Sequence, residues 1–217
     1  MVAGGAARGN VFREEERIFQ AIVIADTFNE RFMPITLDKP RCLLPLVNVP
    51  IIEYTLEFLA VSGIQEVFLF CRAHADQIKD YIGRSRWNRP TSTMQVQVIM
   101  NPECSSLGDA LRDIDAKSLI TGDFVLCSGN IVSNMNLTAA LQRHQERRKA
   151  DKNVIMTMVL RPCDPGHRTR ERAEGAVFVL DGTSGECLLY EPVDSERVDA
   201  RFVFDFEYFE GRRTVSV

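Results

Sequence analysis

The sequence predicts an α/β protein: a Rossmann-like, doubly wound and mainly parallel sheet, with a β-hairpin excursion in the C-terminal part. Short apolar runs of strand length recur through residues 19–160, and segments with helical periodicity lie between them. Strands that alternate with helices in this way form right-handed βαβ units, which assemble into a parallel sheet. From residue 161 the helical segments stop and two apolar runs flank a turn-forming stretch, which indicates the hairpin.

The first strand opens the stretch around which the chain is organised, residues 19–50. It holds the near-continuous apolar run Ala21-Ile22-Val23-Ile24-Ala25, which is typical of a strand buried on both faces. A loop punctuated by prolines follows from Asp26. Ligands of open α/β sheets bind at the loops after the strands, so this loop is the first candidate for a binding site.

The middle of the chain supplies further strands and helices. Asn48 is the expected N-cap of a helix that begins at Pro50, and Gly63 is its expected C-terminal stop. Either Ser105 or Ser106 is the expected start of a later helix, and Asn136 the expected cap of another. The other strands are expected at residues 66–71, 96–100, 124–127 and 154–160, with a shorter helix at residues 73–82.

The C-terminal part has a β pattern. Residues 176–180 and 187–190 are expected to pair as a hairpin, because the residues between them favour a turn. Alternating aromatic residues at 202–208 predict another strand, and residues 214–217 begin one more. We therefore expect a disordered tail at residues 1–18 and one domain at residues 19–217, truncated at its C-terminal end.

Composition excludes several classes of function. The chain has 217 residues, 45% of them hydrophobic, and a formal net charge of −4, whereas a general nucleic-acid binder would carry a basic surface. No apolar run is long enough to span a bilayer. The six cysteines never form a CxxC pair, so their spacing offers neither a zinc site nor a compact disulfide framework. A reduced, cytosolic protein is expected.

Residues 22–51 carry a resemblance to a known family. They contain ADTFNERFMPIT at residues 25–36, then Pro40-Arg41, LLPL at residues 43–46 and Pro50-Ile51. This string resembles the sugar-nucleotide pyrophosphorylase, or nucleotidyltransferase, superfamily, whose first loop reads roughly AAGxGTRLxPLT, followed by PK, LLPV and a later P-I.

Within that superfamily the chain resembles the epsilon subunits of the eukaryotic translation initiation exchange factor two B. The resemblance covers about residues 19–217 and is strongest before residue 160. The residues that carry it are 25–29, 31–32, 43–46, 54–59, 106–109 and 113–117.

The first loop departs from the family pattern. Thr27 and Asn29 stand at the glycine positions of a loop whose backbone N–H groups approach nucleotide phosphates in the family. Asp26 adds negative charge where a triphosphate would lie. Sterics and electrostatics therefore both oppose nucleotide binding. The resemblance places Arg31 at pyrophosphate in active relatives; here we expect it to hold the loop or to contact a partner.

Three later positions depart as well. The lysine that follows proline in the family is Arg41, which lacks the compact geometry of lysine. The metal-binding Gly-Asp of the family is Gly129-Asn130, and a neutral amide is a weaker magnesium ligand than a carboxylate. The glutamate-lysine-proline of the family is Glu191-Pro192, without the lysine. These losses predict a domain with no catalytic residues, no metal and no cofactor.

Aspartates offer a weaker candidate for a metal site. Asp109, Asp113 and Asp115 lie on one predicted helix, but at i, i+4 and i+6 their carboxylates do not converge. We therefore expect a solvated helix face there.

The resemblance implies a non-catalytic scaffold and subunit-assembly domain. Its partners would be the gamma subunit, the other subunits of the same exchange factor, and initiation factor two, the GTP-binding complex from which the factor promotes GDP release. It implies no membrane and no direct nucleic-acid partner. The β-helix and the catalytic helical-repeat domain of the family would lie outside these residues. The alternatives are an active sugar-phosphate nucleotidyltransferase using NTP and magnesium, and a pocket that keeps a nucleotide or sugar phosphate as a regulatory ligand.

Arginine-rich stretches are the strongest surface feature of the sequence. Arg147 and Arg148 lie near the end of a predicted helix, and Arg168 and Arg170 lie in a polar loop. These four arginines are candidate contacts for an acidic partner surface. An ordinary solvated helix end and loop is the alternative interpretation.

Overall fold

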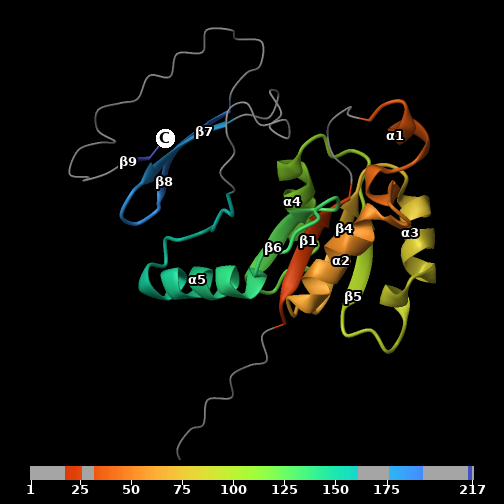
Figure 1. Ribbon diagram of the computed structural model, residues 1–217, viewed down its shortest axis with the longest axis horizontal. Helices are drawn as coiled ribbons and strands as arrows, with labels where there is room; N and C mark the ends of the chain where they lie inside the picture. The colour runs from red at the N-terminus through yellow and green to blue at the C-terminus, as the bar shows by residue number, and fades with distance from the viewer. Residues whose placement is uncertain (1–17, 26–31, 161–175, 193–214, 217) are drawn as a thin grey trace, which may run out of the picture. The chain divides into compact units, whose positions relative to one another are not determined.

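The computed structural model describes residues 18–25, 32–160, 176–192 and 215–216. The chain divides into two compact units, Met1–Thr157 and Met158–Val217. In the first unit, four parallel strands form a sheet in the order β5-β4-β1-β6 (Figure 1). The strands are β1 (Gln20–Ile24), β4 (Glu66–Cys71), β5 (Gln95–Met100) and β6 (Phe124–Ser128). This parallel sheet confirms the predicted α/β class.

Strand β1 lies at the centre of the sheet, and all five of its residues are buried. Its side chains alternate between two hydrophobic cores. Ala21 and Val23 belong to the core on one face, whereas Ile22 and Ile24 belong to the core on the other. A strand with a core on each face needs apolar residues at every position, which explains the continuous run in the sequence.

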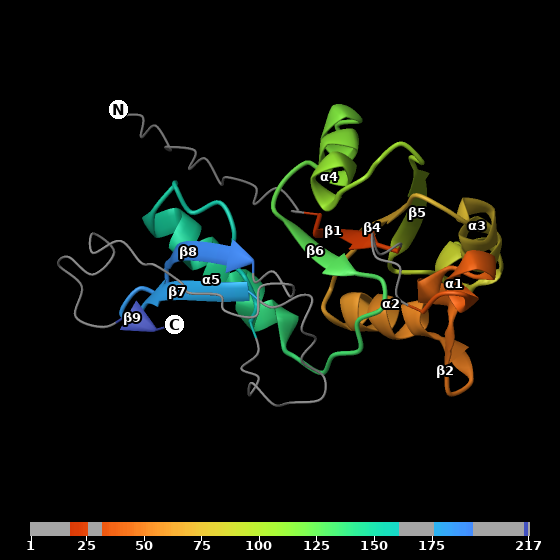
Figure 2. The same ribbon diagram turned by 90° about the horizontal axis from the view of Figure 1, so that it is seen from above.

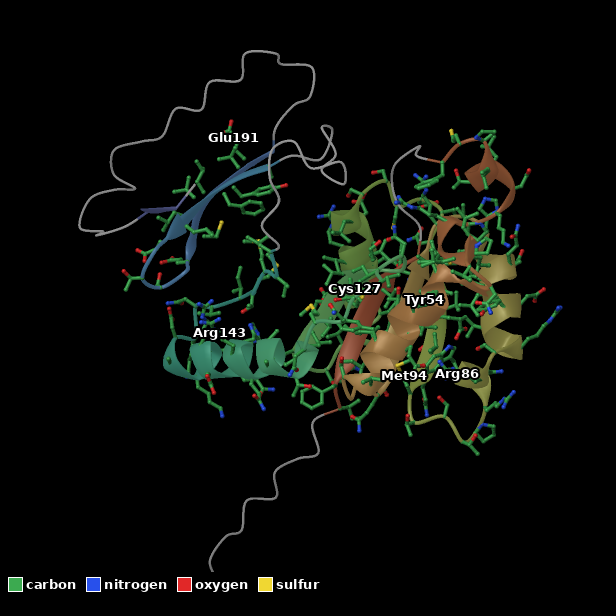
Figure 3. All side chains as sticks on the ribbon, in the orientation of Figure 1. Tyr54, Arg86, Met94, Cys127, Arg143 and Glu191 are labelled. Carbon is green, nitrogen blue, oxygen red and sulfur yellow. The ribbon has the colours of Figure 1, made fainter. Side chains whose placement is uncertain are left out.

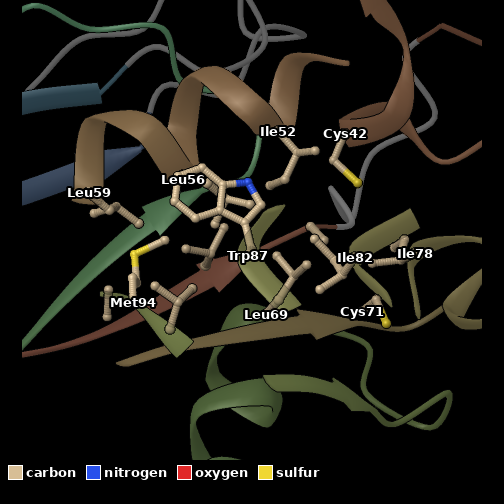
Figure 4. Close-up of a cluster of buried hydrophobic side chains, with 14 of the residues drawn as sticks. Cys42, Ile52, Leu56, Leu59, Leu69, Cys71, Ile78, Ile82, Trp87 and Met94 are labelled. Carbon is tan, nitrogen blue, oxygen red and sulfur yellow. The ribbon is translucent and has the colours of Figure 1, made fainter. Parts of the chain in front are cut away.

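Helices cover both faces of the sheet (Figure 2). On one face α2 (Ile51–Val61) and α3 (Ala75–Arg84) pack with Trp87 of the 3-10 helix η2 (Arg86–Asn88). Figure 4 shows Trp87 between α2 and the strands. On the other face α4 (Leu107–Ala116) contributes Ala110 and Ile114. The predicted doubly wound arrangement is confirmed.

Two of the predicted caps close their helices as expected. Ser106 accepts a hydrogen bond from the Asp109 backbone N–H at 3.2 Å, and the Asp109 carboxylate accepts from the Ser106 backbone N–H at 3.0 Å, which forms a capping box. The Asn136 side chain caps α5 (Leu137–Ala150) by accepting from the Ala139 N–H at 3.2 Å. Gly63 follows α2 with φ of +83°, as a C-terminal stop requires.

Two of the three aspartate carboxylates of α4, those of Asp109 and Asp113, have partners within the protein. Hydrogen bonds from Ser105, Ser106 and Arg112 hold the pKa of Asp109 well below its usual range. The hydrogen bond from Lys117 likewise lowers the pKa of Asp113, with a further contribution from Asn101. Among the residues that the structure describes, no three His, Cys, Asp or Glu side chains are grouped to hold a metal ion.

Two local predictions were wrong. Asn48 does not cap α2, because it lies in the loop of a small hairpin formed by β2 (Pro45–Leu46) and β3 (Val49–Pro50), and Pro50 is the N-cap residue. Residues 154–160 form no strand. The side chain of Ile155 there is 88% exposed. The apolar, β-branched run has the propensity for a strand, but a strand also requires hydrogen bonds to a neighbour, and the run crosses the boundary between the two units.

The second unit contains the predicted hairpin. Strands β7 (Ala176–Asp181) and β8 (Cys187–Pro192) pair antiparallel, and β9 (Val215–Ser216) pairs with β7 on its other side. The Asp181 carboxylate accepts hydrogen bonds from the backbone N–H groups of Thr183 and Ser184 at 2.7 and 2.8 Å, which shapes the turn. The predicted strand at 202–208 lies outside the described residues, as does the predicted tail except Ile18. None of the described helices is long and apolar enough to cross a membrane.

Candidate functional site at the carboxyl edge of the sheet

The candidate site lies where β1 and β6 end beside each other. Ile24 is in register with Ser128, and the Gly129 N–H donates to the Ile24 carbonyl at 2.8 Å. A Cβ added at Gly129 would lie 3.1 Å from the Ala25 Cα and 3.2 Å from the Ile24 carbonyl oxygen. Backbone atoms cannot move aside as a flexible side chain can, so glycine is required for this close approach. Asn130, the next residue, is thereby fixed next to the end of β1.

Arg41 reaches the same edge from the loop after β1. It begins the 3-10 helix η1 (Arg41–Leu43), whose other two residues, Cys42 and Leu43, are buried and anchor the turn. The Arg41 guanidinium lies over the ring of Phe32, 4.7 Å from its centroid. This distance is within the range of a cation–π interaction.

Hydrogen bonding assigns the orientation of the Asn130 amide. With its oxygen toward Arg41, Asn130 accepts from the guanidinium Nε at 3.3 Å and from Nη2 at 3.1 Å, and its nitrogen donates to the Ser128 hydroxyl at 2.5 Å. The opposite orientation keeps only the contact between Ser128 and the amide oxygen, and turns the amide N–H groups toward a guanidinium that can only donate. We therefore adopt the first orientation, in which Asn130 bridges Arg41 and Ser128.

This arrangement does not fit a magnesium ion. Mg²⁺ is bound by hard, anionic oxygens, and the position that the family resemblance gives to a carboxylate holds the neutral Asn130. The amide oxygen of Asn130 already faces the positive charge of Arg41, which would repel a cation. Nor does the edge offer a thiolate, because burial raises the pKa of Cys127 on β6 to about 12. The Arg41–Asn130 pair therefore does not supply the ligands that metal-assisted chemistry needs at this edge.

Thr55 supports the site from α2 and was missed by the sequence analysis. Its side chain is fully buried, donates to the Ile131 carbonyl at 2.9 Å and accepts from the Ile131 N–H at 3.2 Å. These bonds fix the chain directly after Asn130. The sequence did contain a signal: Thr55 lies at i+3 in the core stripe of Ile52, Leu56 and Leu59, where a hydroxyl requires a partner.

The remaining predicted site residues are distributed as follows. Asp26, Thr27, Asn29 and Arg31 lie outside the described residues, as do Arg168 and Arg170. Glu191 and Pro192 end β8 in the second unit. Arg147 and Arg148 lie in the last turn of α5, and Arg148 forms an ion pair with Asp123. Of the predicted loop residues that are described, Arg41 and Asn130 are in direct contact.

Comparison with known proteins places the chain in a family. The family model described as nucleotidyl transferase matches residues 20–165. The chain belongs to the nucleotidyl transferase family. The match covers the sheet and both residues of the Arg41–Asn130 pair, and it confirms the family resemblance of the first loop.

Two curated relatives are similar over most of the chain. The protein named translation initiation factor eIF2B subunit epsilon from Schizosaccharomyces pombe is 56% identical over 198 residues, which is 91% of this chain and 29% of the relative. The protein of the same name from Dictyostelium discoideum is 47% identical over 184 residues, which is 85% of this chain and 26% of the relative. The chain thus spans less than a third of the length of these relatives.

A solved structure shows the same fold at low sequence identity. The structure of apo UDP-glucose pyrophosphorylase superposes with a TM-score of 0.50 and 18% sequence identity, covering 61% of this chain and 56% of that one. This similarity supports the nucleotidyltransferase-like fold and is too distant to carry an argument about substrate.

Proposed function

We propose that this chain is a non-catalytic scaffold and subunit-assembly domain of an epsilon-type subunit of initiation factor eIF2B. Identity of 56% over 91% of the chain to a protein of that name supports the assignment. The observation that carries the non-catalytic part is the Arg41–Asn130 pair. It puts a guanidinium against a neutral amide where the family resemblance requires a carboxylate for metal. The full-length protein would promote GDP release from initiation factor two, in the cytosol and without a cofactor in this domain.

The loss of transferase chemistry can be measured directly. We expect isothermal titration of Mg-GTP or Mg-ATP into the purified chain to show no binding tighter than about 1 mM. We also expect no pyrophosphate release when a sugar 1-phosphate is added. The physical reason is that Asn130 lacks the charge to hold magnesium and that Arg41 is already bonded to it.

Asn130→Asp is the matched variant for this test. It restores a carboxylate at the same position, but we expect the new charge to pair with Arg41 and the chain to remain inactive. Micromolar binding together with pyrophosphate release by the unmodified chain would contradict the proposal and favour an active nucleotidyltransferase. Binding without release would instead indicate a regulatory ligand.

The assembly role concerns the end of α5. Arg147, Arg148 and Lys149 lie together in its last turn, and the side chain of Arg148 is 51% exposed despite its ion pair with Asp123. Arg148 and Lys149 are exposed and Arg147 is half-buried, and cations at such a surface attract an acidic partner and speed its association. Part of their charge complements the helix C-terminus, which contributes to the stability of α5 alone. Arg168 and Arg170, which lie outside the described residues, extend the proposal to the sequence that follows.

Charge reversal of α5 tests this contact. We expect Arg147→Glu combined with Arg148→Glu, in the full-length subunit, to lower co-purification of the other eIF2B subunits or of initiation factor two by about tenfold. Thermal stability should change little, because exposed ion pairs contribute at most about 1 kcal/mol. The matched control is Lys79→Glu with Arg89→Glu, an equal charge change at exposed positions elsewhere in the first unit. Equal loss of partners in both double variants, or in neither, would contradict the contact at α5.

A further inference from the structure

A short exposed loop connects two buried residues of the core on the α2 side of the sheet. It runs over residues 88–93, between Trp87 of η2 and Met94, which are 7% and 0% exposed. Five of its six residues are exposed, and Ser92 is half-buried. Arg86, just before Trp87, and Met94 are labelled in Figure 3. The loop is therefore accessible along its length, while both of its ends are anchored in the core.

The loop contains a turn that has an arginine at one end and a serine at the other. The Ser92 N–H donates to the Arg89 carbonyl at 2.9 Å, which closes a four-residue turn over Pro90 and Thr91. Proline is favoured at the second position of such a turn, because its ring fixes φ there. The end residues of a β-turn have Cα atoms less than about 7 Å apart. A group carried on the Ser92 hydroxyl therefore lies within reach of the Arg89 guanidinium.

The same two residues form a pattern that basophilic protein kinases recognise. These enzymes select a serine with an arginine three positions before it, because carboxylates of the kinase bind the guanidinium. The pattern Arg-x-x-Ser occurs twice in the sequence, at Arg89–Ser92 and at Arg213–Ser216. Ser216 belongs to strand β9, which is paired with β7, whereas Ser92 lies in the exposed loop. A paired strand is not available to a kinase, so the structure favours Ser92.

We propose that Ser92 is a phosphorylation site for a basophilic serine/threonine kinase. In this step the γ-phosphoryl group of ATP is transferred to the Ser92 Oγ, ADP leaves, and the hydroxyl proton passes to the catalytic aspartate of the kinase. The loop can open to the kinase at little cost, because none of its side chains between the two anchors is buried. The product phosphate, with a charge of about −1.5 to −2 at pH 7, forms a charge-assisted pair with Arg89 across the turn.

Phosphorylation of Ser92 also acts on the core, through Met94. The Ser92 hydroxyl donates to the Met94 carbonyl at 2.6 Å and accepts from the Met94 N–H at 3.3 Å. A phosphate dianion has no proton to donate, so the Met94 carbonyl loses its bond from Ser92. Met94 belongs to the same core cluster as Trp87, and β5 begins at the next residue. The modification therefore loosens the connection between the loop and the start of β5.

The test is incubation of the purified chain with ATP and the catalytic subunit of cAMP-dependent protein kinase, a basophilic enzyme, followed by mapping of the phosphate by mass spectrometry. We expect phosphate on Ser92 and none on Ser216. Arg89→Ala should lower the rate of incorporation by about tenfold or more, because it removes a charge-assisted contact to the kinase. Arg84→Ala is the matched control. The Arg84 side chain is 85% exposed but lies too far before Ser92 to be read with it, so the rate should not change.

Amide hydrogen exchange tests the effect on the core. We expect exchange at residues 92–95 to rise on phosphorylation, and to rise in Ser92→Ala without the kinase, since both changes remove the hydroxyl that holds Met94. Circular dichroism before the incubation verifies that each variant is folded. Unchanged exchange in both would contradict the effect on Met94.

Three outcomes of the mapping overturn the proposal. They are no incorporation at all, phosphate on Thr91, Thr93 or Ser216 in place of Ser92, and equal rates in Arg89→Ala and Arg84→Ala. None of them depends on the assembly role proposed above, which is read from co-purification of other subunits.

Discussion

Replacing Trp87 by alanine is expected to lower the free energy of unfolding by about 3–5 kcal/mol. Trp87 is 7% exposed and packs in the core beneath α2, beside Ile82 and Leu69 (Figure 4). Its removal leaves a cavity that the surrounding helices can fill only in part. Urea unfolding followed by circular dichroism measures the change, since the variant removes the only tryptophan of the chain and with it the fluorescence signal.

The indole also belongs to a polar network, so two contributions must be separated. Its Nε1 donates to the Glu53 carboxylate at 3.1 Å, which accepts from the Tyr81 hydroxyl at 2.8 Å as well. Burial, with the hydrogen bond to Glu53, raises the pKa of Tyr81 and keeps this hydroxyl a donor. Trp87→Phe keeps most of the packing and removes the hydrogen bond, and we expect it to cost about 1–2 kcal/mol. Equal costs for phenylalanine and alanine would contradict the cavity argument.

The sheet could be predicted because its strands carry strong and local signals. β1 and β4 are continuous apolar runs, and a buried strand in a parallel sheet tolerates little else. The caps at Ser106 and Asn136 were also predicted correctly, since a short polar side chain at the start of a helical pattern satisfies a backbone N–H close in sequence.

The two errors have a common cause: strand pairing, and not the propensity of the single residues, decided the structure in both places. Asn48 has the chemistry of a cap, but the pairing of Leu46 with Val49 places it in a hairpin loop. Residues 154–160 have the composition of a strand and no strand pairs with them among the described residues. A strand exists only as part of a ladder, and a sequence window does not contain its partner.

The candidate site was predicted as separate residues and not as an arrangement. Arg41 and Asn130 were each identified as departures from the family pattern, 89 positions apart in the numbering. Their contact depends on the register of β1 with β6, which brings Gly129 against Ile24. The role of Thr55 depends on the same adjacency, because its partner Ile131 follows Asn130. Side-chain chemistry could therefore be read from the sequence, whereas mutual position required the fold.

Thr55→Val is expected to lower the free energy of unfolding by about 2–3 kcal/mol, although the two side chains have nearly the same shape. Valine fills the same space but can neither donate to the Ile131 carbonyl nor accept from the Ile131 N–H. Both backbone groups, which are partly buried, would then lose these partners, at about 1–3 kcal/mol each before relaxation. Urea unfolding of the two proteins side by side gives the difference.

The same substitution should loosen the candidate site. Thr55 holds the residue after Asn130, so we expect amide hydrogen exchange at residues 129–131 to rise in Thr55→Val more than in the strands of the sheet. Thr55→Ser is the matched control: it keeps the hydroxyl, loses one methyl group, and should cost only about 1 kcal/mol with normal exchange at the site. If valine proves as stable as the wild type, or if serine is the more damaging of the two, then Thr55 acts through packing alone. The position of Asn130 against Arg41 would in that case be set by the glycine approach at β1, without help from α2.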